Sequence, residues 1–151
     1  MSLRFVKASK KDADLIVEIY NAAFYDDFIK YGRCPAYGKT KEQMEVSIEK
    51  FPKLIVFYED NPVGIISVEI KEKGVYYVCC FCVIPTYQGK GIGKQAFHYW
   101  LELYKDWKKI TLITPVDKEE NIKFYTEKCG FTVDGTEMDE NIKMVHFSLE
   151  R

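Results

Sequence analysis

The sequence of 151 residues predicts a mixed α/β fold with a mixed sheet, and three observations lead to this prediction. Segments with helical spacing of apolar residues alternate with short segments rich in β-branched and aromatic residues. Short turn sequences separate several of the predicted strands, so hairpins are interspersed with helices. The segment VYYVCCFCVI at 75–84 is apolar without interruption, which predicts a strand buried on both faces of a sheet. No repeat, low-complexity tract or linker interrupts the chain, so we expect a single domain over residues 1–151.

The N-terminal part predicts one strand and one helix. Residues 3–8 alternate weakly between polar and apolar side chains and predict the strand. Ser9 is a typical helix cap and precedes a predicted helix over about 11–24, whose apolar residues recur at helical spacing. Residues 25–38 are predicted to be irregular, because they contain the breakers Gly32, Pro35 and Gly38.

A second helix and two strands follow. Thr40 is a predicted cap for a helix over 41–50. Residues 54–59 are rich in β-forming side chains, and residues 63–71 alternate between apolar and polar, so both segments predict strands. The sequence Asp-Asn-Pro at 60–62 predicts the turn between them.

The remaining chain predicts two helices and four strands, the first strand being 75–84, which Pro85 ends. The loop 86–93 leads into a helix that ends near Lys105, and the other predicted elements are a strand at 109–114, a helix at 118–128, and strands at 132–137 and 142–149. The predicted order is therefore β-α-α-β-β-β-α-β-α-β-β, a sheet of about seven strands flanked by about four helices.

Charge and hydropathy exclude several classes of function. The 22 basic and 23 acidic side chains leave a net charge of −1, which argues against nonspecific binding of nucleic acid. No apolar run approaches the length of about 18 residues that a membrane span needs. The first residues lack the apolar core of a signal peptide, so we expect a cytoplasmic protein without membrane or nucleic-acid partners.

The cysteines and histidines do not indicate a metal site. The odd number of cysteines favours free thiols, and no CxxC pair is present. His98 and His146 are far apart in the sequence, so we expect no metal cofactor. Three cysteines lie within the apolar run, and we expect them to be small core residues: Cys79, Cys80 and Cys82.

The most informative stretch is the loop Gln88-Gly89-Lys90-Gly91-Ile92-Gly93, which lies between a predicted buried strand and a helix. Glycines allow the backbone to approach a ligand closely and to adopt positive φ. The first amides of a helix lack intrahelical acceptors, and the helix dipole adds positive potential. Together these features predict a site for a phosphate or diphosphate, with Lys90 and Lys94 at its edge.

Three phosphate-loop motifs compete for this stretch. The spacing GxGxG is one residue short of the dinucleotide fingerprint GxGxxG. The nucleotide P-loop requires Lys-Ser/Thr, whereas Gln95 follows Lys94 here. The pattern QxxGxG/A, preceded by strand-x-Pro, fits QGKGIG after Val83-Ile84-Pro85 throughout. A nucleotide-binding protein that uses the same loop stays as a rival hypothesis.

With this loop, the sequence resembles the GNAT superfamily, the acetyl-CoA-dependent N-acetyltransferases, over nearly its whole length. A second motif, Asn121-Ile122-Lys123-Phe124-Tyr125 followed by Lys128-Cys129-Gly130-Phe131, supports the resemblance. It implies a mostly antiparallel central sheet and acetyl-CoA (coenzyme A) as the cofactor. It also implies direct transfer of the acetyl group to a primary amine of a small molecule or peptide, and a homodimer by analogy only.

The resemblance implies roles for individual residues. The loop amides and the following lysine would bind the diphosphate, the strand end would pair with the pantetheine, and two residues of the second motif would also contact the cofactor. These implied cofactor-binding residues are Phe81, Cys82, Val83, Gln88, Gly89, Lys90, Gly91, Ile92, Gly93, Lys94, Asn121 and Lys123. For Lys123, a solvated helix lysine is the alternative.

Tyr125 matches the tyrosine that protonates the departing thiolate in many family members, since phenols and thiols ionise in a similar pH range. The family places three residues between this tyrosine and Gly-Phe, whereas four stand between Tyr125 and Gly130 here. Either the helix carries an extra residue, or Tyr125 is a packing aromatic. If the acid is lost, the alternative function is a non-catalytic domain that binds acyl-CoA.

The base and the acceptor pocket are predicted less directly. Glu69 is a candidate base, with a water relay or an exposed strand position as the alternatives. Substrate choice in the family lies largely between the first two helices, where aromatic and carboxylate side chains would attract a cationic amine. The predicted acceptor residues are Tyr25, Asp26, Asp27, Phe28 and Tyr31, together with Tyr77 on the long strand. Aromatic core packing with solvated carboxylates is the alternative for this segment.

Overall fold

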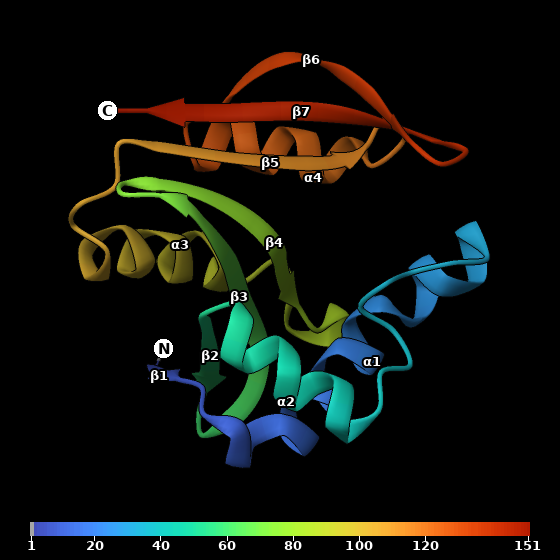
Figure 1. Cartoon of the computed structure of the whole chain (residues 1–151), viewed down its shortest axis with the longest axis vertical. Coiled ribbons are helices and arrows are strands. Elements are labelled where there is room, and N and C mark those ends of the chain that lie inside the picture. The colour runs from blue at the N-terminus through green and yellow to red at the C-terminus, as the bar shows by residue number, and fades with distance from the viewer. Residues whose placement is uncertain (1) are drawn as a thin grey trace. The chain divides into compact units, whose positions relative to one another are not determined.

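All the predicted strands and helices occur in the computed structural model, which describes residues 2–151, and they follow the predicted order (Figure 1). The strands are β1 (Leu3–Lys7), β2 (Lys53–Tyr58), β3 (Asn61–Glu72), β4 (Val75–Val83), β5 (Lys109–Pro115), β6 (Thr132–Asp139) and β7 (Ile142–Glu150). The helices are α1 (Ala13–Tyr31), α2 (Lys41–Lys50), α3 (Ile92–Leu103) and α4 (Glu119–Lys123). The strand order β1-β2-β3-β4-β5-β7-β6 confirms the predicted mixed sheet of seven strands.

The chain forms two compact units. The first unit holds residues 2–69 and 79–96, and the second holds Ile70–Val78 and Phe97–Arg151. Strands β3 and β4 and helix α3 each contribute residues to both units. That residues 1–151 act as one functional domain stays a prediction.

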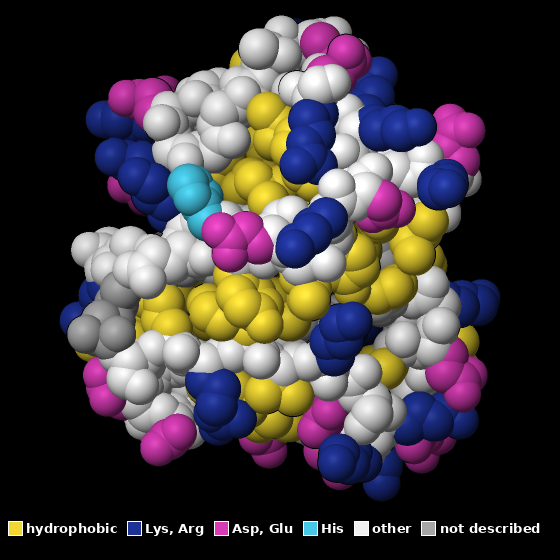
Figure 2. All heavy atoms as spheres, turned by 90° about the vertical axis from the view of Figure 1, so that its left-hand side faces the viewer, with side chains coloured by type: hydrophobic (Ala, Val, Ile, Leu, Met, Phe, Trp, Pro, Cys, Tyr) yellow, Lys and Arg dark blue, Asp and Glu magenta, His cyan; other side chains and the backbone are white. Residues whose placement is uncertain are grey.

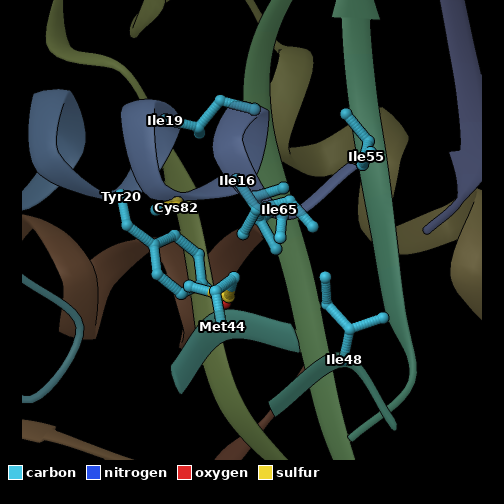
Figure 3. Close-up of a cluster of buried hydrophobic side chains, with 9 residues drawn as sticks. Ile16, Ile19, Tyr20, Met44, Ile48, Ile55, Ile65 and Cys82 are labelled. Carbon is cyan, nitrogen blue, oxygen red and sulfur yellow. The ribbon is translucent and has the colours of Figure 1, made fainter. Parts of the chain in front are cut away.

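The first unit is built on antiparallel pairing. Strand β1 pairs with β2, and β2 pairs with β3, with a register irregularity at Val56/Phe57. Figure 3 shows side chains from α1 and α2 gathered with side chains from the strands in a buried cluster. The cluster is mostly aliphatic and includes Ile16, Ile19, Tyr20, Met44, Ile48, Ile55, Ile65 and Cys82.

The helix starts agree with the sequence, but the end of α1 does not. Thr40 Oγ1 accepts a hydrogen bond from the Gln43 backbone N–H at 3.1 Å, so the predicted cap of α2 is confirmed. A short 3-10 turn, η1 (Lys10–Asp12), follows Ser9 and leads into α1. The prediction that residues 25–38 are irregular was wrong for 25–31, which are helical. No Gly or Pro interrupts those residues, and the helix ends only at Gly32, which adopts φ 73°.

The turn between β2 and β3 lies earlier than predicted. Glu59 and Asp60 both have positive φ, of 49° and 66°, and form the tight connection. Strand β3 consequently begins at Asn61, and Pro62 lies within it rather than in the turn. The sequence signal of Pro62 was therefore misassigned, because proline is also tolerated at the first residues of a strand.

The second unit combines parallel and antiparallel pairing. Strand β4 runs parallel to β5 over Val75–Tyr77, while β7 pairs antiparallel with both β5 and β6. Its interior is rich in aromatic rings. Four of these aromatic side chains are nearly inaccessible to solvent: Phe97, Trp100, Phe131 and Phe147.

Strand β4 is less buried than its apolar sequence predicted. Tyr76, Val78 and Cys82 are buried, but Cys79 is exposed. Because successive side chains point to opposite faces of a strand, only one face is buried along this stretch. The prediction of burial on both faces was wrong, as was the prediction of a core position for Cys79.

The last predicted helix is interrupted. Helix α4 ends at Lys123 and continues as a π-helical segment, η3 (Phe124–Lys128). The predicted extent of 118–128 is therefore nearly correct, but the turn that carries Tyr125 is wider than an α-helical turn.

The surface is mixed in charge. On the face shown in Figure 2, basic and acidic side chains are interspersed, with apolar side chains between them. Among the helices of residues 2–151, none is both long enough and apolar enough to cross a membrane.

Candidate functional site

The glycine-rich loop is anchored at the end of β4. The backbone N–H of Ile84 donates to Val63 O at 2.7 Å, and a 3-10 turn, η2 (Pro85–Tyr87), follows. The Gln88 side-chain Nε2 donates to Val83 O at 2.8 Å. Gln88 thus ties the start of the loop back to the strand, which fixes the direction in which the loop leaves the sheet.

Two glycines define the path of this loop. Gly89 and Gly91 both have φ of +80°, a conformation that L side chains rarely adopt. A Cβ at either position would meet no atom within 4 Å. The backbone conformation, rather than crowding by neighbours, therefore requires glycine at these positions.

Helix α3 begins directly after Gly91 and presents free backbone donors. The Gln95 N–H donates to Gly91 O at 3.2 Å, which is the first hydrogen bond of the helix. The N–H groups of Ile92, Gly93 and Lys94 therefore precede the helical ladder. Ile92 is buried and anchors the helix start, whereas Lys90 and Lys94 are exposed. Free amides, a helix N-terminus and two nearby lysines fit a diphosphate.

The end of β4 is tightly packed against β3. A Cβ built on Gly64 would lie 2.5 Å from Cys82 O, so only glycine fits at this position. Cys82 is buried, whereas Phe81 and Val83 are half-buried. Gly64 was not predicted to be a special position, although a glycine inside a strand pattern indicates a close backbone approach.

A buried polar group in the first unit was also missed. Lys53 Nζ donates to Ser67 Oγ at 2.8 Å, and burial lowers the pKa of Lys53 to about 8. A hydrogen bond from the Cys82 thiol lowers the pKa of Cys80. Burial and the Cys80 thiol raise the pKa of Tyr20 well above its ordinary value. The available signal was a lysine at the start of the otherwise apolar segment KLIVFY.

Tyr125 is buried in the second unit among aromatic rings. Its ring centroid lies 5.9 Å from that of Phe131 and 5.6 Å from that of Phe147. Nearby on α4, Asn121 Nδ2 donates to Thr114 Oγ1 of β5 at 3.2 Å. Lys123 is exposed on the same helix. The second motif therefore combines a fixed tyrosine, an amide anchored to β5 and a solvated lysine.

Five of the predicted acceptor residues lie on the last turns of α1, since this helix extends to Tyr31. Tyr25 and Phe28 are exposed, and the Phe28 ring stacks on the Tyr37 ring at 4.6 Å between centroids. Asp26 is exposed, while Asp27 and Tyr31 are half-buried. The helix thus brings Tyr25 and Phe28 together with Tyr37, and it distributes the two carboxylates around its surface.

The remaining predicted site residues lie on strands. Glu69 is half-buried near the end of β3. Tyr77 is half-buried on β4, and Lys71 Nζ lies 5.6 Å from the centroid of its ring. Within the described part of the chain, no group of three or more His, Cys, Asp or Glu side chains is arranged to hold a metal ion.

Comparisons with known proteins give a consistent result. The profile of the acetyltransferase (GNAT) family matches residues 14–131. Among curated proteins, no sequence matches. At the level of structure the chain is similar to the PaiA N-acetyltransferase of Thermoplasma acidophilum, solved in complex with coenzyme A, with a TM-score of 0.77. That similarity covers 97% of this chain and 98% of that chain, at 18% sequence identity.

Two further solved structures share the fold. An N-acetyltransferase from Staphylococcus aureus Mu50 has a TM-score of 0.78 and 17% identity, over 99% of both chains. A GNAT-family acetyltransferase from Bacillus cereus ATCC 10987 has a TM-score of 0.74 and 21% identity, over 100% of this chain and 99% of that one.

Proposed function

The chain belongs to the acetyltransferase (GNAT) family, and from this we propose that it transfers the acetyl group of acetyl-CoA to a primary amine. One observation carries the proposal: two glycines at φ +80°, in the loop that follows β4 and the turn η2, lead into the free amides of helix α3. That arrangement suits a diphosphate, which coenzyme A contains. A relative of the same fold is solved with coenzyme A, which supports this choice of ligand.

In this proposal the loop holds the diphosphate. The amides of Gln88–Gly93 and the first turn of α3 donate hydrogen bonds to it, and Lys90 and Lys94 add positive charge. The backbone at Phe81–Val83 pairs with the pantetheine, and the side chain of Asn121 donates to it. Lys123 contributes charge near the phosphates or remains solvated.

Acetyl-CoA supplies, when bound, a thioester whose acyl carbon accepts the amine nitrogen. Glu69 is proposed to take the proton of the ammonium substrate, so that the nitrogen presents a lone pair. The nitrogen would bond to the acyl carbon as the carbon–sulfur bond breaks, and the Tyr125 hydroxyl would donate its proton to the departing sulfur. The second proton that the nitrogen loses as the amide forms would pass through solvent to the Tyr125 oxygen, so that the phenol is restored. No metal takes part in this scheme.

The acceptor is proposed to be a cationic small molecule or peptide amine. Tyr25, Phe28 and Tyr31 offer ring faces, and Asp26 and Asp27 offer negative charge, on the last turns of α1. Tyr77 is proposed to line the same acceptor site. Cations bind to aromatic faces and carboxylates together, so this composition favours an amine over a neutral or acidic acceptor.

Replacing Gly91 by Val tests the loop. Valine at φ +80° costs about 1–2 kcal/mol, so the loop must change its path and coenzyme A should bind roughly 10-fold more weakly or worse. The matched control is Gly38→Val, because Gly38 also has φ +80° and also has no atom within 4 Å of an added Cβ. Calorimetric titration with coenzyme A measures both, and unchanged affinity in Gly91→Val would overturn the loop assignment.

Release of free thiol from acetyl-CoA, measured against a panel of primary amines, tests the reaction. We expect turnover with at least one amine and a kcat lower by roughly 100-fold in Tyr125→Phe. Binding of coenzyme A without turnover of any amine would instead indicate a domain that only binds acyl-CoA. Tighter binding of ATP or NAD than of coenzyme A would indicate a nucleotide-binding protein.

A further inference from the structure

The turn that carries Tyr125 contains one residue more than an α-helical turn. The Cys129 N–H donates to Phe124 O at 3.2 Å, five residues back, and the Phe131 N–H donates to Tyr125 O at 2.9 Å, six residues back. A regular α-helix bonds each N–H to the carbonyl four residues back. The segment η3 is therefore a π-turn, a form that proteins use rarely and often near functional sites.

This wide turn coincides with the one irregularity in the second sequence motif. Four residues separate Tyr125 from Gly130, where the family motif has three. A π-turn takes up an additional residue within a single turn, so the helix before it and the chain after it keep their directions. The turn therefore accommodates the additional residue without rotating Tyr125 away from the position that it would have in a regular helix.

Thr126 bonds to the backbone at this turn. Its Oγ1 donates to Ile122 O at 2.9 Å and lies 3.4 Å from Lys123 O. A threonine hydroxyl that bonds back by one turn competes with the regular ladder and bends or opens a helix. The Thr126 hydroxyl thus bonds to the carbonyl groups of Ile122 and Lys123, which directly precede the widened hydrogen bonds. It therefore stabilises the π-turn relative to a regular α-helical turn.

The Tyr125 ring is held in place by contacts with other aromatic rings. It is 9% exposed, and its ring contacts those of Phe124, Phe131 and Phe147 at centroid distances of 5.3, 5.9 and 5.6 Å. Phe124 is the first residue of the wide turn, whereas Phe131 and Phe147 come after it in the chain. Tyr125 therefore keeps contacts on both sides only if the extra residue is absorbed between it and Gly130.

We propose that Thr126 is a positioning residue, whose hydroxyl holds a one-residue π-turn insertion and thereby fixes the orientation of the Tyr125 phenol. The inference rests on the proposed role of Tyr125 as the acid of acetyl transfer. It does not place Thr126 in contact with substrate, since its hydroxyl is bonded to the backbone of α4.

Three variants of the full chain test this assignment. Thr126→Val keeps the β-branched shape and removes the hydroxyl, Thr126→Ser restores the hydroxyl, and deletion of Thr126 removes the additional residue. Deletion of His98 from the regular helix α3 is the matched control, since it must rotate the following residues by about 100°. Two readouts are used: the ¹⁹F resonance of 3-fluorotyrosine placed at position 125, and the steady-state kinetics of acetyl transfer.

We expect Thr126→Val to shift the ¹⁹F resonance and to lower kcat roughly 10-fold, as small misplacements of a reacting group do, with KM for acetyl-CoA unchanged. Thr126→Ser should restore both readouts. The Thr126 deletion should fold and keep the resonance, whereas the His98 deletion should unfold or lose activity. The proposal would be overturned if the Val and Ser variants had the same kcat and the same ¹⁹F resonance. It would also be overturned if the Thr126 deletion shifted the ¹⁹F resonance at position 125.

Failure of the proposed function gives a different pattern. If Tyr125 is not the acid, Tyr125→Phe leaves kcat unchanged, while the ¹⁹F resonance still reports whether Thr126 orients the ring. If Thr126→Val fails to fold, the serine and deletion variants still decide whether the Thr126 hydroxyl stabilises the inserted residue or the turn forms without it.

Discussion

The two compact units bury different chemistry. The first unit encloses an aliphatic cluster from α1, α2 and the strands, and it also encloses the Lys53 ammonium and the Tyr20 hydroxyl. The second unit encloses aromatic rings, and two of its side-chain hydroxyl groups form hydrogen bonds within it. The Tyr76 hydroxyl donates to Asp106 Oδ1 at 2.6 Å, and Thr114 Oγ1 accepts from Asn121.

This difference indicates which changes should affect the stability of each unit. In the first unit, a charged group is desolvated and a phenol is buried without a hydrogen-bond partner among the described residues, so its stability should depend on pH and on those groups. In the second unit, ring packing is the main contribution, so its stability should depend on shape.

Trp100→Ala should give the largest loss of stability. The Trp100 ring packs edge-on against Tyr76 at 5.0 Å and stacks on Tyr104 at 4.6 Å, and its side chain is 2% exposed. Removing a buried aromatic ring leaves a cavity and costs about 3–5 kcal/mol. Urea unfolding followed by circular dichroism measures the change, since tryptophan fluorescence would itself be altered.

The control for this substitution is Leu103→Ala on the same helix, because Leu103 is 37% exposed. Truncating a partly exposed leucine removes less buried apolar surface, so this variant should lose only about 1 kcal/mol. If the two variants lose similar stability, ring packing does not dominate the second unit and the contrast between the units fails.

The parts of the fold that the sequence predicted well are those set by neighbouring residues. Thr40 with Gln43 predicts a helix start because a cap depends on three or four residues. The glycine loop was likewise predictable, since positive φ and a helix start are local properties. The family resemblance and the order of strands and helices both followed from these local signals.

Features set by distant residues were not predictable in the same way. The burial of Lys53 depends on the β2–β3 register, which places Ser67 directly opposite it. The exposed Cys79 depends on which face of β4 is covered. The extra residue between Tyr125 and Gly130 was visible as a count, but only the backbone hydrogen bonds identify the π-turn that contains it.

The pH dependence of stability should report the buried lysine of the first unit. Burial lowers the pKa of Lys53 to about 8, from 10.5 in the unfolded chain. Below pH 8 both states are protonated and the full cost of burying the charge is present. As pH rises from 8 to 10 the folded lysine is already neutral, so the free energy of unfolding should rise by roughly 2 kcal/mol.

The matched variant for this experiment is Lys53→Met combined with Ser67→Ala, which removes both hydrogen-bonding partners. The difference in free energy of unfolding between wild type and variant should change with pH between 8 and 10, while contributions from other groups cancel. A constant difference over that range would show that Lys53 titrates as an exposed lysine does.

Replacing one buried tyrosine by phenylalanine in each unit should change the free energy of unfolding in opposite directions. Tyr20→Phe removes a buried hydroxyl that has no hydrogen-bond partner within residues 2–151, so it should stabilise the protein by about 1 kcal/mol. Tyr76→Phe removes the donor to Asp106 and should destabilise it by about 1 kcal/mol. Both rings are nearly inaccessible, with exposures of 3% and 4%, so packing is matched between the two variants.

The sign of the Tyr20 effect decides between two accounts of the first unit. If the hydroxyl is a desolvated group retained without compensation, its removal restores the free energy lost in burying it. If Tyr20→Phe is instead as destabilising as Tyr76→Phe, then the phenol gains a partner in solution, and the nearby thiol of Cys80 is the group to replace next. A Cys80→Ala change that abolishes the Tyr20 effect would then identify that partner, and the two units would differ in packing but not in how they satisfy buried hydroxyls.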